Sequence, residues 1–321
     1  MAHKRACYSS RANKLPILGI SSCLLGNNVR YNRGHCRSNF ITDTLGKHVT
    51  FRAVCPEVES GMPTPRETMS LHESPDGTRL LGNHTGDDYT EQLNEAVQRI
   101  LNEPRMIGMN GFIVKSKSPS CGLHRATFTD RRGVTSRSSA GLFTSALKSA
   151  YPNLPVETEG RLNDANIRYD FLTRIFANQR LDDIKKDLSP SRLIEYHTQN
   201  KSLIRSHHEM LYRELGRLIA DLSPGVDVVY NKYRTLHAEA LSHPSSPGRH
   251  HNVLMHLYGY FKNTLRDAAK SDLRDVIDKY RKGVVPLTVP TMMMRQHAKH
   301  FEDLYVEHQT YLQPFPVELI K

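Results

Sequence analysis

The chain has 321 residues, of which 44 are lysine or arginine and 33 are aspartate or glutamate, giving a formal net charge of +11 at pH 7. No stretch is both apolar and long enough to cross a bilayer, and the basic N-terminus lacks the apolar core of a secretion signal, so we expect a soluble, cytoplasmic protein. The five cysteines, an odd number, argue against a disulfide framework, and the length suggests two domains.

Short apolar runs with β character are the first predicted elements. They cover residues 15–21, 49–54 and 111–115. Before the third run, apolar residues recur at helical spacing behind Asp87 and Asp88, which offer N-cap oxygens, and a further short helix is predicted over 141–150. Strands that alternate with helices are typical of βαβ units, so residues 1–162 are predicted to form an α/β domain with a mainly parallel sheet.

The second half of the chain has a different pattern, in which one helix follows another. Helices are predicted over residues 190–222, 228–242, 252–282 and 290–308. Segments rich in proline, glycine and serine separate them. Residues 163–321 are therefore predicted to form an all-α domain.

Three of the five cysteines closely follow the predicted strands. Cys23 comes after the first run, Cys55 directly after the second and Cys121 shortly after the third, whereas Cys7 and Cys36 follow no such run. Ligands of an open parallel sheet bind beyond the carboxyl ends of its strands. The three thiols are therefore predicted to meet at one edge of the sheet, although 98 positions separate the first from the last.

Thiolates are soft ligands that select iron–sulfur clusters, zinc or copper(I). Three thiolates on a four-iron cluster would leave one iron open, which is typical of a catalytic rather than a structural metal site. From spacing alone a second interpretation stays open, namely that these cysteines are small apolar core residues.

The motifs around these cysteines resemble the thiouracil desulfurase family over roughly residues 15–160. The matching segments are SSCLLGNNVRYNRGH (21–35), VCPEVESGMPTPRE (54–67), TGDDYT (85–90) and KSKSPSCG (115–122). The second half resembles the YbgA-like helical domain. Its matching segments are 193–208, 250–262 and 311–316.

The resemblance implies a [4Fe-4S] cluster held by Cys23, Cys55 and Cys121, whose remaining iron takes the sulfur of a thiolated base such as 2-thiouracil. It also implies that Glu57 and Ser118 assist the reaction. We expect Glu57 to move protons, because it lies two residues from a ligand, and Ser118 to donate a hydrogen bond. The net exchange of C=S for C=O changes no oxidation state.

Two alternatives to a catalytic cluster stay open, one because the sequence departs from the family pattern at Cys36 and one because the chain is basic. Cys36 lies near the first motif, where the family pattern has no cysteine, and a fourth ligand there would close the site, with iron or with zinc. The positive charge is spread over both halves, so an RNA-associated protein with a structural cluster is the other alternative, although no RNA-binding signature accompanies it.

Several other polar residues have two interpretations. Arg30 and Arg66 either bind an anionic ligand or brace the motif loops through backbone carbonyls. Five histidines of the second half either form a second metal site or act as capping and surface residues: His207, His208, His250, His251 and His256. Adjacent helical residues point in different directions, which favours the second interpretation.

Overall fold

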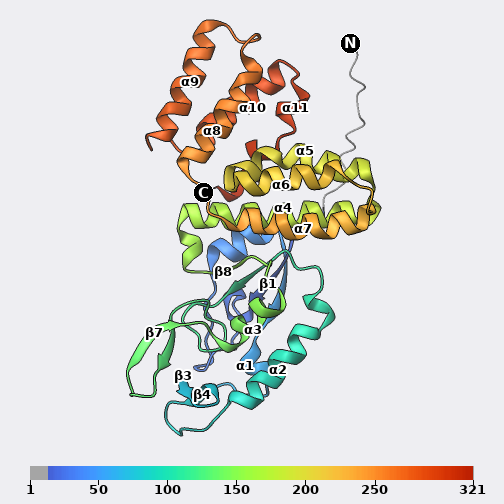
Figure 1. The fold of residues 1–321 in the computed structure, drawn as a ribbon. Coiled ribbons are helices and arrows are strands. Elements are labelled where there is room, and N and C mark those ends of the chain that lie inside the picture. The colour runs from blue at the N-terminus through green and yellow to red at the C-terminus, as the bar shows by residue number, and fades with distance from the viewer. Residues whose placement is uncertain (1–13, 321) are drawn as a thin grey trace.

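The computed structural model describes residues 14–320, without the side chains of Arg137 and Ser138, so Cys7 lies outside the described residues. An α/β half and a helical half lie one above the other (Figure 1). No helix in the described part of the chain combines the length and the apolar character needed to cross a membrane.

The predicted parallel sheet is confirmed. Its four strands are β1 (Ile17–Ser21), β2 (Thr50–Val54), β5 (Gly111–Val114) and β8 (Val156–Thr158). They run in the order β2-β1-β5-β8, and each neighbouring pair is parallel. The three strands that precede Cys23, Cys55 and Cys121 are therefore neighbours, with β1 in the middle.

Successive strand residues point to opposite sides of this sheet, and each side packs into a different hydrophobic cluster. Phe112 and Val114 face a cluster with helices α2 (Thr90–Asn102) and α3 (Leu142–Ala150). On the other face, Leu18 and Ile20 pack with residues of the short helical turns at 40–47 and of α4 (Ala165–Ile184).

The aspartates before α2 behave partly as predicted. Asp88 accepts the backbone N–H of Thr90 at 2.9 Å and an N–H of Arg79 at 2.8 Å, although Tyr89 occupies the N-cap position itself. Asp88 therefore supports the start of α2 and also ties it to the neighbouring hairpin.

A second sheet was not predicted from the sequence. Its strands are β3 (Met69–Ser74), β4 (Gly77–Gly82), β6 (Ala126–Thr129) and β7 (Thr135–Ser139), in the order β4-β3-β6-β7. It consists of two antiparallel hairpins joined by the parallel pair β3–β6. The short helix α1 (Pro56–Glu59) lies between β2 of the first sheet and β3.

The second half is mostly helical, as predicted, but its helices are shorter. After α4 come α5 (Pro190–His207), α6 (Glu209–Ala220), α7 (Val226–Ser242), α8 (Pro247–Tyr258), α9 (Asp267–Arg281), α10 (Thr288–His300) and α11 (Leu304–Glu307). The predicted helices over 190–222, 252–282 and 290–308 are each broken once. The first break is at His208, whose backbone is extended. Its ring Nδ1 caps α6 by accepting the N–H of Leu211 at 3.1 Å.

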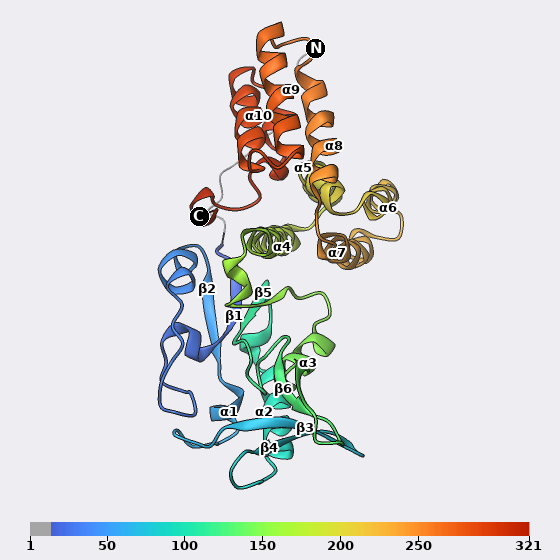
Figure 2. The same cartoon turned by 90° about the vertical axis from the view of Figure 1, so that its left-hand side faces the viewer.

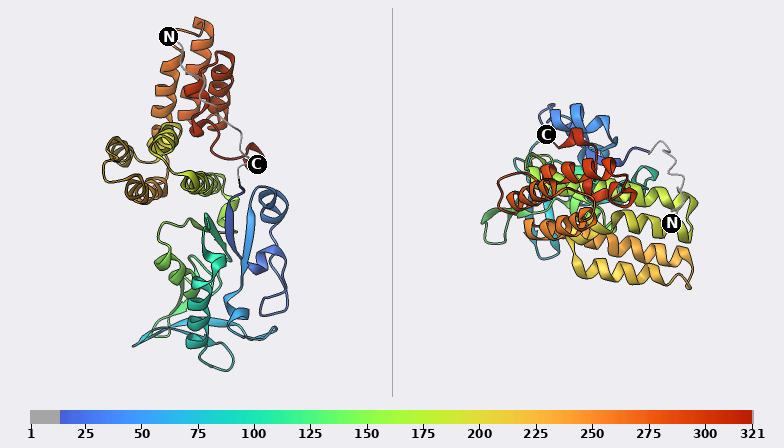
Figure 3. Two further views of the ribbon diagram at one scale, coloured as in Figure 1. Left: turned by 90° about the vertical axis from the view of Figure 1, so that its right-hand side faces the viewer. Right: turned by 90° about the horizontal axis from the view of Figure 1, so that it is seen from above.

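The two halves share one hydrophobic cluster. Phe171 and Ile175 of α4, together with Phe315 and Leu319 near the C-terminus, pack with the strand residues of the first sheet. Figures 2 and 3 show α4 at the junction, with α8–α10 extending away from the α/β half. The domain boundary at residues 162/163 stays a prediction, and α4 is the element through which the α/β half gains part of its core.

Candidate functional site

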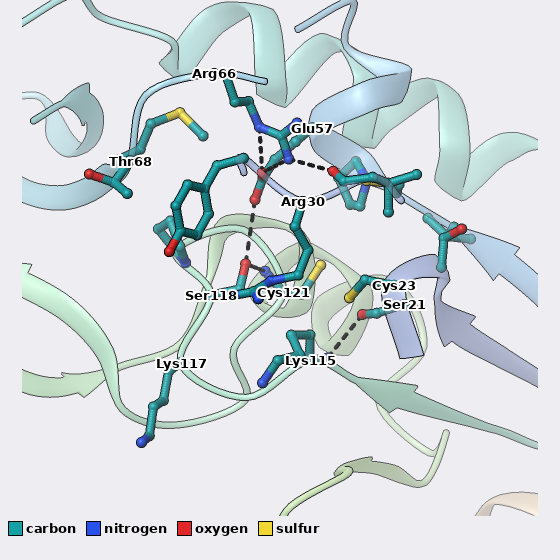
Figure 4. A pocket seen from close by; sticks show the side chains of 18 of the residues that line it. Ser21, Cys23, Arg30, Glu57, Arg66, Thr68, Lys115, Lys117, Ser118 and Cys121 are labelled. Carbon is teal, nitrogen blue, oxygen red and sulfur yellow. Dashed lines mark hydrogen bonds and ion pairs between the residues drawn. The ribbon is translucent and has the colours of Figure 1, made fainter. Parts of the chain in front are cut away.

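A cavity of about 300 Å³ lies at the carboxyl ends of β1, β2 and β5. Cys23, Cys55 and Cys121 all line it, and so do Glu57 and Ser118. Figure 4 shows Cys23 and Cys121 on one side of the cavity and Glu57 opposite them. Three of the four motif segments, 21–35, 54–67 and 115–122, thus meet at the cavity, whereas the segment 85–90 does not line it.

Local hydrogen bonds fix the backbone of Cys55. It is the N-cap residue of α1, and its N–H donates to Glu59 Oε1 at 2.9 Å. Glu59 in turn pairs with Arg105. Because Pro56 presets the first helical residue, the chain turns directly from β2 into α1 and leaves the Cys55 side chain at the cavity.

The loop that carries Cys121 rests on the start of α3. Backbone N–H groups of Leu142 and Phe143, which have no partner inside the helix, donate to the carbonyls of Pro119 and Ser120 at 3.1 and 3.0 Å. A Cβ on Gly122 would lie 2.7 Å from the Ser118 carbonyl oxygen. The loop can therefore close this tightly only with glycine at position 122.

Cys36 lies close to Cys23 but does not line the cavity. Its N–H donates to the Cys23 carbonyl at 2.9 Å, and its side chain packs against the cluster on the second face of the sheet. The Cys36 backbone therefore supports the Cys23 turn, and its thiol lies near enough to Cys23 to raise the pKa of that residue.

Burial controls the acidity of the three cavity thiols. It raises the pKa of Cys23 to about 12, with further increases from the neighbouring Cys36 and Cys55 thiolates. Burial also raises the pKa of Cys55 and raises that of Cys121 well above its ordinary value. Three thiolates in this place therefore require a cation, which a coordinated metal supplies.

The donor set fits a cluster better than a single ion. In the described part of the chain, no three His, Cys, Asp or Glu side chains are arranged to hold one ion. The ligands of a cluster bind different metal atoms, so they surround a volume and do not converge on a point. The buried thiols of Cys23 and Cys121 and the half-buried thiol of Cys55 all line one cavity, so this soft donor set fits a cluster.

Glu57 is held firmly in the cavity wall. Its Oε2 accepts from Arg66 Nε at 2.9 Å and also pairs with Arg66 Nη2. Its Oε1 accepts from Ser120 Oγ at 2.8 Å, whereas Ser118 Oγ lies at 3.5 Å, the outer limit of a hydrogen bond. Of the two serines in the S-P-S-C motif, the one not predicted as a site residue thus contacts the carboxylate more closely.

Arg30 and Arg66, for which the sequence left two interpretations, have different surroundings in the structure. Arg66 is nearly buried, with a side chain 6% exposed, and it also donates to the carbonyls of Val29 and Pro63. It therefore braces the motif loops and Glu57 together. Arg30 lines the cavity, with its guanidinium carbon 5.3 Å from the centre of the Tyr31 ring.

Lys115 and Ser116, at the end of β5, line the cavity but were not predicted as site residues. Lys115 lines the cavity, and its Nζ lies 2.5 Å from Glu159 Oε1, which also accepts from Ser116 Oγ at 2.7 Å. Although burial opposes it, the pKa of Glu159 is lowered by these hydrogen bonds. The position of Lys115 directly after a predicted strand was the available signal.

The histidines of the helical half do not form a metal site among the described residues. His207 and His250 are buried, and their Nδ1 atoms contact the His243 carbonyl at 2.8 Å and the Tyr311 hydroxyl at 3.1 Å. His208 caps α6, and His251 contacts Asp278 at 3.2 Å. The capping interpretation holds for His208, whereas His207 and His250 belong to the core.

The family comparisons divide the chain into the same two parts as the motifs. Residues 18–159 match the family model described as 2-thiouracil desulfurase. Residues 201–316 match a family described as a protein of unknown function, DUF1722.

Two curated relatives and one solved structure are similar to this chain. The uncharacterized protein YbgA of Escherichia coli (strain K12) is 35% identical over 148 residues, which are 45% of this chain and 88% of that protein. The uncharacterized protein YbbK of Bacillus subtilis (strain 168) is 31% identical over 153 residues, 45% of this chain and 97% of that protein. The [4Fe-4S]-dependent thiouracil desulfidase TudS is 29% identical, with a TM-score of 0.37, and the match covers 47% of this chain and 94% of TudS.

Proposed function

Because the chain belongs to the 2-thiouracil desulfurase family through residues 18–159, we propose that it is an iron–sulfur enzyme that replaces the sulfur of a thiolated pyrimidine, or of a related thiocarbonyl compound, by oxygen. The net reaction consumes water and releases sulfide, so no redox partner is needed. The family supports desulfuration as the activity, and the cluster type and the substrate are part of the proposal.

One observation carries the proposal most strongly. Three cysteines from three separate segments line the same cavity as an acidic side chain, Glu57, and a hydroxyl, Ser118. A structural thiol site needs no acid–base group beside it. A hydrolytic site needs an acid–base group as well as the thiols, because water must lose a proton when it attacks the thiocarbonyl carbon.

Cys23, Cys55 and Cys121 would hold a [4Fe-4S] cluster. When bound, the cluster supplies an iron without a protein ligand, a thiophilic Lewis acid that polarises the C=S bond. The chain's own residues then have to bind the ring and manage the protons. The cavity volume of about 300 Å³, which includes the space that the cluster would take, is at the small end of ligand sites and favours a small substrate.

Glu57 is suited to hold a proton at Oε1. Arg66 occupies Oε2, whereas Oε1 accepts from Ser120 Oγ and keeps a second lone pair for water or substrate. Ser118 is suited to donate, because its oxygen already accepts the N–H groups of Ser120 and Cys121 at 3.2 and 3.1 Å. Its remaining proton can bond to a ring atom of the substrate.

The test is an anaerobic assay of cluster-reconstituted protein with 2-thiouracil, which follows the loss of thiocarbonyl absorbance and the release of sulfide. The expected result is brown protein that contains iron and turns over. Ser149→Ala is a matched control for variants of the site, because Ser149 is exposed, does not line the cavity and donates to the Ser145 carbonyl of its own helix at 3.1 Å.

Other outcomes would contradict the proposal. Colourless protein that binds zinc through Cys36 as a fourth ligand would favour the closed site. Brown protein that binds RNA with a strong salt dependence, and turns over no thiocarbonyl compound, would favour the RNA-associated alternative.

A further inference from the structure

The geometry of Glu57 separates its two carboxylate oxygens. Oε2 receives both the Nε and the Nη2 groups of Arg66, a charged pair whose side chains are only 6% and 14% exposed. Oε1 receives the hydroxyl of Ser120 at 2.8 Å. A carboxylate held by both oxygens keeps one rotamer, so the free lone pair of Oε1 has a fixed direction.

Ser120 has no access to a ligand. It is 0% exposed, and it is absent from the cavity wall although Ser118, Pro119 and Cys121 all belong to it. Its carbonyl accepts the N–H of Phe143 at 3.0 Å, which ties it to the start of α3. Its hydroxyl therefore points from a rigid backbone to Glu57 and to no substrate.

Ser118 has the opposite arrangement. Its side chain lines the cavity, and its oxygen accepts the N–H groups of Ser120 and Cys121. The distance to Glu57 Oε1 is 3.5 Å, so this contact holds the carboxylate weakly. The two serines of one motif thus have different partners.

We propose that Ser120 is a positioning residue for the desulfuration reaction, and that it aims Glu57 Oε1 at the reacting water or sulfur compound. Arg66 fixes the other oxygen of the same carboxylate. The inference rests on the proposed function for its kinetic consequences, but the contact itself does not.

The kinetic test is Ser120→Ala in the cluster-reconstituted enzyme, with 2-thiouracil as substrate. We expect kcat to fall roughly ten- to hundred-fold, the range for a lost hydrogen bond to a charged group, while KM and the iron content per protein stay at the wild-type level. The Ser149→Ala control should keep all three values.

A double-mutant cycle separates positioning from general support of the loop. In the Glu57→Gln background, Ser120→Ala should lower the residual kcat by less than about twofold, because the group it positions has already lost its acid–base capacity. Equal losses in both backgrounds would overturn the proposal. So would a Ser120→Ala enzyme whose loss follows entirely from a lower iron content.

A cycle on the stability of the full chain as purified keeps the inference separate from the proposed function. If the wild type acts on no thiocarbonyl compound, the proposed function fails, but Ser120→Ala and Glu57→Gln should still show a coupling in urea-unfolding midpoints. Additive shifts in that cycle would show that Ser120 does not hold Glu57, whatever the reaction of the site.

Discussion

The two halves of the molecule both bury polar motif residues, but they use them differently. In the α/β half, the buried cysteines and the Glu57–Arg66 pair line an open cavity. In the helical half, buried histidines each make a hydrogen bond through one ring nitrogen inside the core, although His207 Nε2 and His237 Nδ1 have no partner among the described residues. His197 Nδ1 contacts the Tyr233 hydroxyl at 3.1 Å, and His237 Nε2 contacts the Tyr196 hydroxyl at 3.2 Å.

The difference shows that cysteines and histidines close together do not by themselves identify a metal site. Both halves are rich in such residues, so the residue types alone do not separate a site from a polar core. In the helical half, His197 and His237 each have a tyrosine hydroxyl as partner, and burial lowers the pKa of His237 to about 3. In the α/β half, burial raises the thiol pKa values, and the thiols face space that a ligand can fill.

The comparison predicts its largest effect at the cysteines. Cys121→Ala should abolish both the bound iron and turnover, because two thiolates do not hold a four-iron cluster. Cys36→Ala is the matched control, since Cys36 does not line the cavity, and it should retain iron and activity. Iron content and absorbance of anaerobically reconstituted protein measure both.

The reverse result would break the comparison. If Cys36→Ala lost the iron while a cavity cysteine could be replaced, the cluster ligands would differ from those proposed. Iron that survives every cysteine replacement would point to the helical half instead.

The sequence predicted three of the four parallel strands. β1 and β5 are buried on both faces and so appear as short apolar runs, whereas β2 is half-buried for most of its length. The short fourth strand, β8, was not predicted. The second sheet was missed because β4 and β7 are exposed or half-buried for much of their length. The turn signal Pro75-Asp76-Gly77 between β3 and β4 was present, and it marks a hairpin. The helix break at His208 carries no proline or glycine, so the sequence pattern ran through it.

The part of the candidate site that lies directly after the strands was predictable from the sequence. Cys23, Cys55 and Cys121 could be placed together because neighbouring parallel strands end at one edge. The contacts of Glu57 with Ser120 and Arg66 were not predictable, because they depend on how two loops meet in space. The roles of Glu57 and Ser118 stay predictions.

Acidification should distinguish the halves next. Burial lowers the pKa values of four histidines in the helical half, to about 4 for His197 and His207 and about 3 for His237 and His250. Above pH ~6.5 both the folded and the unfolded chain keep them neutral. As the pH falls toward 4, only the unfolded chain takes up protons, and each histidine removes about 1.4 kcal/mol of stability per pH unit.

The described histidines of the α/β half lie at the surface or are half-buried, unlike the four core histidines above: His35, His48, His72, His84 and His124. Hydrogen exchange at pH 7.5 and pH 5.0 should therefore show lost protection in α5, α7 and α8 before the first sheet. Earlier opening of the sheet would contradict the contrast between the two halves.

The smallest effect should come from one hydrogen bond of the helical core. Tyr233→Phe removes the hydroxyl that contacts His197 and leaves a buried ring nitrogen without a partner, so the free energy of unfolding should fall by about 1–2 kcal/mol. Tyr258→Phe is a suitable control, since no hydrogen bond of its hydroxyl is found among the described residues. Thiouracil turnover should stay unchanged in both variants, because neither tyrosine lines the cavity. A Tyr233→Phe enzyme with full stability but lower turnover would mean that the helical core acts on the reaction, and the division between a bonded core and an open site would no longer hold.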